Sequence, residues 1–119
     1  MLIATWNVNS IRTRIDQVQS WLKETSPDLL CLQETKVDDP LFPEEEFIAQ
    51  GFHVSFLGQK AYNGVALISK IPLEDIRMGF EPEIGDVEGI EEFNAQKRII
   101  SALIEGIRVV NVYVPNGSD

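Results

Sequence analysis

Two stretches of the sequence change abruptly from apolar to polar residues. The run LIATW near the start is followed by NVNS, and the run LLCL is followed by QETK. Short apolar runs that end in polar residues are typical of buried strands. The pattern therefore predicts strands over residues 2–8 and 28–33, with polar side chains at the point where each strand ends.

Between these strands, apolar residues recur at helical spacing from Ile11 to Leu22. This spacing predicts a helix over residues 11–24, and Ser10 is placed to cap its N-terminus. A strand, helix and strand in this order place the two strands parallel, with a right-handed crossover. The first third of the chain is therefore expected to be a parallel unit.

The remaining pattern predicts more strands than helices. A short helix is expected near residues 43–50, strands in FHVSFLG and GVALISK, a weak edge strand at 73–78, and a hairpin formed by KRIISALI and IRVVNVYV. The segment 79–96 is rich in acidic residues and has no Lys or Arg, which predicts a loop. With antiparallel pairs following a parallel one, the expected fold class is α/β or α+β with mixed sheets.

Composition limits the class of protein and its possible binding partners only in part. The chain has 119 residues, 44% of them hydrophobic, and a net charge of −9, as expected for one soluble globular domain. Because the negative charge gathers in segment 79–96, it argues against loose, non-specific nucleic-acid binding but not against a locally basic groove. The single cysteine, Cys31, lies in an apolar run, so we expect a buried thiol rather than a disulfide or a cysteine-based zinc site.

No apolar run approaches the roughly 18 residues that a membrane span needs. The first residues also lack the basic start and small-residue cleavage site of a signal peptide. Cytoplasmic residence is therefore expected, with no membrane partner.

The polar residues at the strand ends are the candidate chemistry. Asn7 and Glu34 end two strands that are expected to be parallel neighbours, so they would lie about 5 Å apart at one edge of the sheet. An amide oxygen and a carboxylate are hard ligands that suit Mg²⁺ or Mn²⁺. Spacing alone leaves open the more common alternative, in which Glu34 is a solvated strand end and Asn7 a turn former.

Three further residues are placed near the same strand ends. Tyr113 closes the last strand and could contact a phosphate or orient a leaving group. Arg12 and Lys36 could meet phosphates of a nucleic-acid backbone. For each of them taken singly, ordinary packing or surface solubility remains the alternative.

Five segments then combine into a family resemblance. They are TWNVNSIRTR, PDLLCLQETKV, YNGVALISK, QKRIISA and NVYVPNG. In this order they resemble the exonuclease III family of abasic-site endonucleases, within the endonuclease/exonuclease/phosphatase superfamily. The resemblance covers essentially the whole chain. It implies a four-layer α/β sandwich similar to deoxyribonuclease I, with residues 1–119 as the N-terminal, incomplete portion of the domain.

The resemblance also implies a function. Such enzymes are Mg²⁺-dependent phosphodiesterases of base-excision repair that cut double-stranded DNA beside abasic sites and trim its 3′ ends. By motif, Asn7 and Glu34 correspond to the metal site, and Tyr113 to the active-site tyrosine. Arg12 matches a basic position that lies against the DNA backbone. Asn9 stands where some relatives have Asp, immediately behind the metal ligands.

The chain also departs from the family. The second half of the family's fold supplies a Gly-Asp-x-Asn segment and a Ser-Asp-His segment, and neither occurs here. The 119-residue chain is therefore expected to be inactive alone. Two alternatives stay open: another phosphoesterase of the superfamily, such as an inositol-phosphate phosphatase or a deadenylase, or a non-catalytic interaction module.

A structural expectation follows from the same departure. If one sheet of the sandwich lacks its partner, apolar residues on its inner face lie partly open. The residues expected there are Ile3, Leu30, Leu32, Leu67, Ile100 and Ile104, or the residues that alternate with them along the strands. The isolated chain is therefore expected to be marginally stable or to self-associate, whereas a full-length parent is expected to be a monomer.

Overall fold

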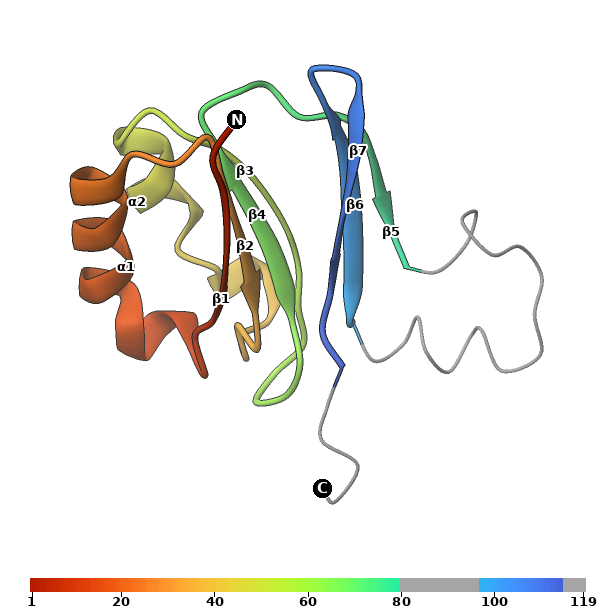
Figure 1. Cartoon of the computed structure of the whole chain (residues 1–119). Helices are drawn as coiled ribbons and strands as arrows, with labels where there is room; N and C mark the ends of the chain where they lie inside the picture. The colour runs from red at the N-terminus through yellow and green to blue at the C-terminus, as the bar shows by residue number, and fades with distance from the viewer. Residues whose placement is uncertain (80–96, 115–119) are drawn as a thin grey trace, which may run out of the picture.

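The computed structural model describes residues 1–79 and 97–114. In these residues two sheets lie face to face, and the helices α1 (Ile11–Thr25) and α2 (Glu44–Ala49) cover the outer face of the first sheet (Figure 1). This arrangement gives three of the layers of the predicted four-layer sandwich. Nearly all of the acidic segment 79–96 lies outside the described residues.

The first sheet combines one parallel pair with two antiparallel pairs. Its strands, in spatial order, are β1 (Ile3–Asn7), β2 (Leu29–Gln33), β4 (Val65–Ser69) and β3 (His53–Leu57). β1 and β2 are parallel, as the sequence predicted, and β4 pairs antiparallel with both β2 and β3. The carboxyl ends of β1 and β2 therefore open at the same edge of the sheet.

The second sheet is an antiparallel meander. Its strands are β5 (Glu74–Met78), β6 (Ile99–Ile104) and β7 (Ile107–Val112), in that spatial order. Glu105 and Gly106 join β6 to β7 with φ angles of 50° and 80°, as a two-residue hairpin turn with two left-handed positions requires. The predicted hairpin and the predicted edge strand are both confirmed.

Helix α1 follows the predicted amphipathic pattern. The Ser10 side chain accepts a hydrogen bond from the Thr13 backbone N–H at the helix start, which confirms the predicted cap. Ile11, Val18 and Leu22 form the buried face of the helix. No helix in the described part of the chain is both long and apolar enough to cross a membrane.

Both tryptophans of the protein lie where α1 packs on the first sheet. Trp6 on β1 and Trp21 on α1 meet edge to face, with 5.9 Å between the ring centroids and 71° between the ring planes. This is a favourable aromatic geometry. The pair fixes α1 against the edge strand of the sheet.

The connection from β2 to β3 contains one element that the sequence analysis did not predict. Asp39–Leu41 forms a single turn of 3₁₀ helix before α2. The Asp39 carboxylate accepts a hydrogen bond from the Gly58 backbone N–H at 2.7 Å. This contact ties the connection to the end of β3.

The expectation of an open inner sheet face is wrong for five of the six residues named above. Leu30, Leu32, Leu67, Ile100 and Ile104 are all 0% exposed. Leu30 and Leu32 face the helices, while Leu67 packs against Ile100 and Ile104 between the two sheets. The chain therefore contains a second sheet that covers most of the first.

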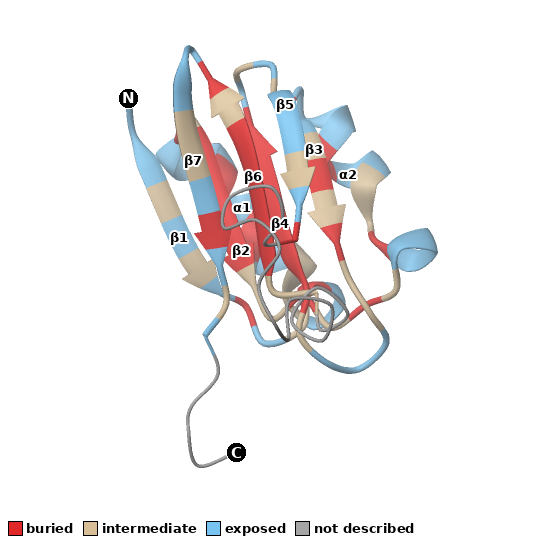
Figure 2. Cartoon of the chain, turned by 90° about the vertical axis from the view of Figure 1, so that its right-hand side faces the viewer, coloured by how far each residue is buried: buried red, intermediate tan, exposed pale blue. Residues whose placement is uncertain are grey.

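Ile3 alone fits the expectation, since it is 45% exposed. β1 lies at the edge of the first sheet and extends beyond β7, so no strand of the second sheet covers it (Figure 2). Of the six residues named above, only this one at the edge of the sandwich lies open.

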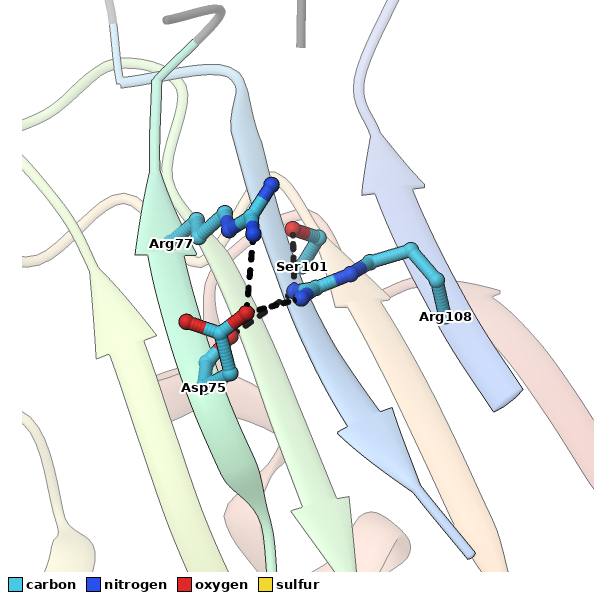
Figure 3. Close-up of polar contacts among 4 residues, drawn as sticks. All are labelled: Asp75, Arg77, Ser101 and Arg108. Atoms are coloured by element: carbon cyan, nitrogen blue, oxygen red, sulfur yellow. Dashed lines mark hydrogen bonds and ion pairs between the residues drawn. The ribbon is translucent and has the colours of Figure 1, made fainter. Parts of the chain in front are cut away.

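The outer face of the second sheet carries a charged cluster (Figure 3). Asp75 on β5 pairs with Arg77 at 2.9 Å and with Arg108 on β7. Arg108 also donates to the Ser101 hydroxyl on β6 and to the Asp75 backbone carbonyl. Arg108 therefore spans all three strands and holds the short edge strand β5, whose pairing with β6 is irregular between Glu74 and Arg77.

Candidate active site

The candidate site lies at the carboxyl ends of β1 and β2, where backbone hydrogen bonds continue beyond the strands. The Ser10 N–H donates to the Glu34 carbonyl at 2.8 Å, and the Ile11 N–H donates to the Thr35 carbonyl at 3.1 Å. The start of α1 is therefore joined to the segment that follows β2.

A third segment closes on the same edge from the loop before β4. The Thr35 N–H donates to the Gly64 carbonyl at 3.3 Å, and the Lys36 N–H donates to the Asn63 carbonyl at 2.9 Å. Residues from the YNG motif thus hold the QETK motif in place, which explains locally why the two occur together.

The backbone at this edge is unusual. Asn9, Ser10, Glu34, Lys36 and Asn63 all have positive φ angles, between 47° and 92°. Positive φ is uncommon outside glycine, and such positions persist only where the surrounding hydrogen bonds fix them. The gathering of five of them in three joined segments indicates a site held in a defined shape.

The Glu34 carboxylate is the centre of the site. Its pKa is held below the usual value, chiefly by a hydrogen bond from Tyr113, with further help from the Asn7 amide and the Lys36 ammonium. Partial burial opposes this shift. The side chain is 20% exposed, so an ionised carboxylate remains accessible from solvent.

Asn7, Asn9 and Lys36 surround this carboxylate. The Asn7 side-chain oxygen accepts from the Asn9 N–H at 3.2 Å, while its amide group hydrogen-bonds Glu34. The Lys36 ammonium lies 3.7 Å from Glu34 Oε2 and donates to Asn9 Oδ1. Asn9 thus hydrogen-bonds two of the three groups around Glu34.

The structure therefore brings together five of the six residues singled out in the sequence. Asn7, Asn9, Glu34, Lys36 and Tyr113 form one connected set. Arg12 stands apart from them. It lies in the first turn of α1, which begins at the same edge, and its exposed side chain makes no hydrogen bond or ion pair within the described ranges.

The donor set fits one kind of metal site. The ionised carboxylate of Glu34 is a hard oxygen ligand, and the Asn7 side-chain oxygen, which accepts from the Asn9 N–H, is a second hard oxygen beside it. Within residues 1–79 and 97–114 no three acidic, histidine or cysteine side chains cluster as a metal cage. These residues fit a Mg²⁺ ion that takes most of its ligands from water and phosphate.

Two residues with a part in this site were missed in the sequence. Gln33 donates from Nε2 to Thr5 Oγ1 and to Asn111 Oδ1, each at 2.8 Å. Asn111 donates from Nδ2 to backbone carbonyls of β2 and β4. A signal was available: Asn111 lies two residues before Tyr113 in a strand, so both share the inner face.

Cys31 takes no part in the site. It is buried between the sheets, and desolvation raises the pKa of its thiol to about 11. The prediction of a buried, structural thiol is confirmed.

The comparison with protein families assigns the chain to one class. Residues 4–109 match the family described as endonuclease/exonuclease/phosphatase family. The chain belongs to this family, whose model matches most of its length.

Individual relatives narrow the similarity further. The chain is 38% identical to exodeoxyribonuclease III of Haemophilus influenzae, over 98% of this chain and 42% of that protein. The structure is similar to an AP endonuclease from Archaeoglobus fulgidus at 49% identity and a TM-score of 0.84, over 97% of this chain and 42% of that one. These similarities confirm the predicted fold class and the resemblance to exonuclease III and abasic-site endonucleases.

A third relative was solved with nucleic acid. It is a 3′ phosphatase from Neisseria bound to a product DNA hairpin, with 43% identity and a TM-score of 0.85 over 98% of this chain and 42% of that one. The chain thus spans less than half the length of these relatives.

Proposed function

We propose that this chain carries part of the active site of a Mg²⁺-dependent phosphodiesterase of base-excision repair. Its substrate is double-stranded DNA with abasic sites or 3′ ends. The observation that carries the proposal is the meeting of Glu34, Asn7 and Tyr113 at the edge where the two sheets face each other. The DNA-directed names of the relatives support it.

Each residue of the site has a proposed role. Glu34 is the metal carboxylate and Asn7 its amide partner, while Asn9 orients Asn7 and Lys36 from behind. Held by Glu34 and Asn7, Mg²⁺, or Mn²⁺ in its place, would supply positive charge against the phosphoryl oxygens. The Tyr113 hydroxyl, now donating to Glu34, is placed to donate to a phosphate oxygen beside it.

The two basic residues are proposed to contact the DNA backbone. Lys36 adds positive charge within the site, and Arg12 adds it on the exposed first turn of α1. Phosphate contacts of this kind position a duplex without reading its sequence. They are also compatible with the net charge of −9, because that charge argues only against loose, non-specific binding.

Residues 1–119 are proposed to form the N-terminal portion of one endonuclease/exonuclease/phosphatase domain, because they span only 42% of the Haemophilus relative. The Gly-Asp-x-Asn and Ser-Asp-His segments of the resembled family are not among them. The chain alone therefore lacks a group to activate water, and we expect no measurable incision of abasic DNA by it.

A chimera tests the function directly. The part of the Haemophilus influenzae relative that lies beyond its match to this chain is joined to residue 119, and Mg²⁺-dependent incision of an abasic duplex is measured. Glu34→Gln is expected to lower the rate by about a hundredfold or more, since it removes charge stabilisation from the reacting centre. Glu24→Gln, an exposed substitution on α1, is the matched control and should leave the rate unchanged.

Other outcomes would overturn the proposal. Incision by the 119-residue chain alone, abolished by Glu34→Gln, would refute the expected inactivity. A chimera that hydrolyses inositol phosphates or poly(A) in preference to abasic DNA would identify another phosphoesterase of the superfamily. Ligand binding without turnover that is indifferent to Glu34→Gln would identify an interaction module.

The isolated chain is also proposed to self-associate, whereas a longer parent is proposed to be a monomer. Ile3 on β1 and Val110 and Val112 on β7 are 45%, 43% and 39% exposed beside a groove of about 390 Å³. Both strands are edges of their sheets, and apolar edges favour pairing between copies. Light scattering should give a mass above 13.4 kDa; a monomer at all concentrations would contradict this.

Cytoplasmic residence remains a prediction. Fractionation of cells that express the tagged protein would test it, and recovery with the membrane or secreted fraction would refute it.

A further inference from the structure

A buried amide joins the two sheets just inside the candidate site. Asn111 on β7 is 3% exposed and points its side chain at the first sheet. Its Nδ2 donates to the backbone carbonyls of Leu32 and Ala66, each at 2.9 Å. Those two residues are direct partners across β2 and β4. One side chain therefore holds two neighbouring strands of the opposite sheet.

The oxygen of the same amide is used as well. Asn111 Oδ1 accepts from Gln33 Nε2 at 2.8 Å. Gln33 immediately precedes Glu34, and Asn111 lies two residues before Tyr113 on the same strand face. The Gln33–Asn111 hydrogen bond thus links the same two chain segments as the Tyr113–Glu34 hydrogen bond, one step further into the molecule.

A contribution to folding stability does not by itself explain why an amide, rather than an apolar side chain, occupies this position. The neighbouring inter-sheet residues Cys31 and Val109 are apolar and need no hydrogen bonds. A buried amide must recover the hydrogen bonds it loses to water, and the net gain per bond is only about 1 kcal/mol. What a fully bonded buried amide adds is a defined geometry, because its donors and acceptor can be satisfied in few relative positions of the two sheets.

We propose that Asn111 is a positioning residue for Tyr113. Its amide fixes how β7 lies across β2 and β4, and so brings the Tyr113 hydroxyl to the Glu34 carboxylate. The catalytic meaning of this contact rests on the function proposed above, but the positioning itself is a property of this chain.

The test measures the contact directly in the 119-residue chain, without metal or DNA. Nuclear Overhauser effects between the Tyr113 ring protons and the Glu34 side chain are recorded by NMR. Asn111→Leu, which keeps the branching at Cγ and removes the amide, is expected to lose these cross-peaks while the chain stays folded. Val109→Ala is the matched control, since it lies two residues away on the same strand face and contributes only packing. It should keep the cross-peaks even though it destabilises the fold.

A second variant keeps the test decisive if Asn111→Leu does not fold. Gln33→Met retains the length of the side chain but loses the donor to Asn111, and it should weaken the cross-peaks. Unchanged cross-peaks in every folded amide variant would overturn the proposal. So would an equal loss in Val109→Ala. Neither result depends on nuclease activity, so failure here and failure of the proposed function are distinguishable.

Discussion

Thr35 Oγ1 lies 2.0 Å from the position that a Cβ on residue 64 would occupy, so the QETK segment closes on the loop before β4 only because that residue is glycine. Gly64 also has a φ of +95°, in the region that glycine favours. Thr35 is 1% exposed, and within the described residues its hydroxyl has no hydrogen-bond partner. The placement of Glu34, one residue away, therefore depends on a close approach of two backbones.

This contact predicts that Gly64→Ala is strongly destabilising. The substitution adds a methyl group where Thr35 already lies and forces a non-glycine residue into left-handed backbone. The expected loss is about 2 to 4 kcal/mol of unfolding free energy, from backbone strain and overpacking together. Urea denaturation followed by circular dichroism measures it.

Thr35→Ala provides the control for the steric part of that loss. It removes the hydroxyl that a Cβ on residue 64 would meet, but leaves the positive φ in place. In this background Gly64→Ala should cost about 1 to 2 kcal/mol less, as for residues in direct contact. Strictly additive effects would show that the clash is not the cause.

A second prediction concerns the acid range. Because Tyr113 is the main cause of the lowered Glu34 pKa, Tyr113→Phe should raise that pKa toward the ordinary glutamate value. A carboxyl whose pKa is lower in the folded state adds stability above its unfolded pKa and loses it as pH falls through the folded value. The variant should therefore lose less stability than the wild type on acidification, and NMR titration of the Glu34 carboxyl carbon measures the shift.

The control for this titration is the other tyrosine. Tyr62 is 69% exposed and is not among the groups that shift the Glu34 pKa. Tyr62→Phe should leave the titration of Glu34 unchanged. An unchanged Glu34 pKa in Tyr113→Phe as well would show that the Tyr113–Glu34 hydrogen bond is not the cause of the shift.

A third prediction concerns the cluster on the second sheet. Arg77 and Arg108 hold the pKa of Asp75 below its usual value, so this carboxylate stays paired until the pH falls through that lowered value. Asp75→Asn keeps the shape and tolerates the φ of 44°, but removes the charge. The backbone amides of β5 should then exchange faster with deuterium, since one of the contacts that hold this edge strand is weakened.

High salt should produce a similar acceleration in the wild type, because exposed ion pairs are screened. Glu74→Gln on the same strand removes an equal charge and is the control. Equal acceleration by both substitutions would indicate a general charge effect rather than the specific pairing with the two arginines.

A fourth prediction concerns Cys31. With a thiol pKa of about 11, only about a thousandth of the side chain is thiolate at pH 8, and the sulfur is buried. Alkylation by iodoacetamide should be at least about a hundredfold slower in the native chain than in urea. Comparable rates in both would show that the inter-sheet core opens readily.

Much of the fold follows from local pattern. The spacing from Ile11 to Leu22 was enough for α1, and the run at 29–32 was enough for a strand covered on both faces, which the structure confirms. Strand pairing was predictable for β1 and β2, because the connecting helix makes them parallel, and for β6 and β7, because a two-residue turn joins them. The apolar strand sequences do not show which face of each strand packs against the helices and which packs against the other sheet.

The wrong expectation of an open inner sheet face shows why the packing of each face could not be predicted. Leu29 and Leu30 are equally apolar and equally buried, yet one faces the second sheet and the other the helices. Alternation gives two faces without saying what covers each one. The expectation of an open face assumed that the covering sheet was absent, whereas β6 and β7 supply it.

The candidate site was predictable where strand ends converge and not where side chains cross between sheets. The closeness of Asn7 and Glu34 follows from parallel pairing alone, whereas their interpretation as metal ligands came from the family resemblance. The contact of Tyr113 with Glu34 joins segments far apart in the sequence, and the part of Asn111 depends on the distance between two sheets. Such contacts are set by tertiary packing, which local patterns do not encode.

The placement of both tryptophans has an optical consequence. Trp6 and Trp21 meet where α1 packs on the first sheet, and both belong to the core on that side rather than to the core between the two sheets. Intrinsic tryptophan fluorescence therefore reports the docking of that helix and is blind to the fraying of β5, β6 and β7. If the second sheet separates first on heating, the emission spectrum will stay native while the tyrosine signals have already changed.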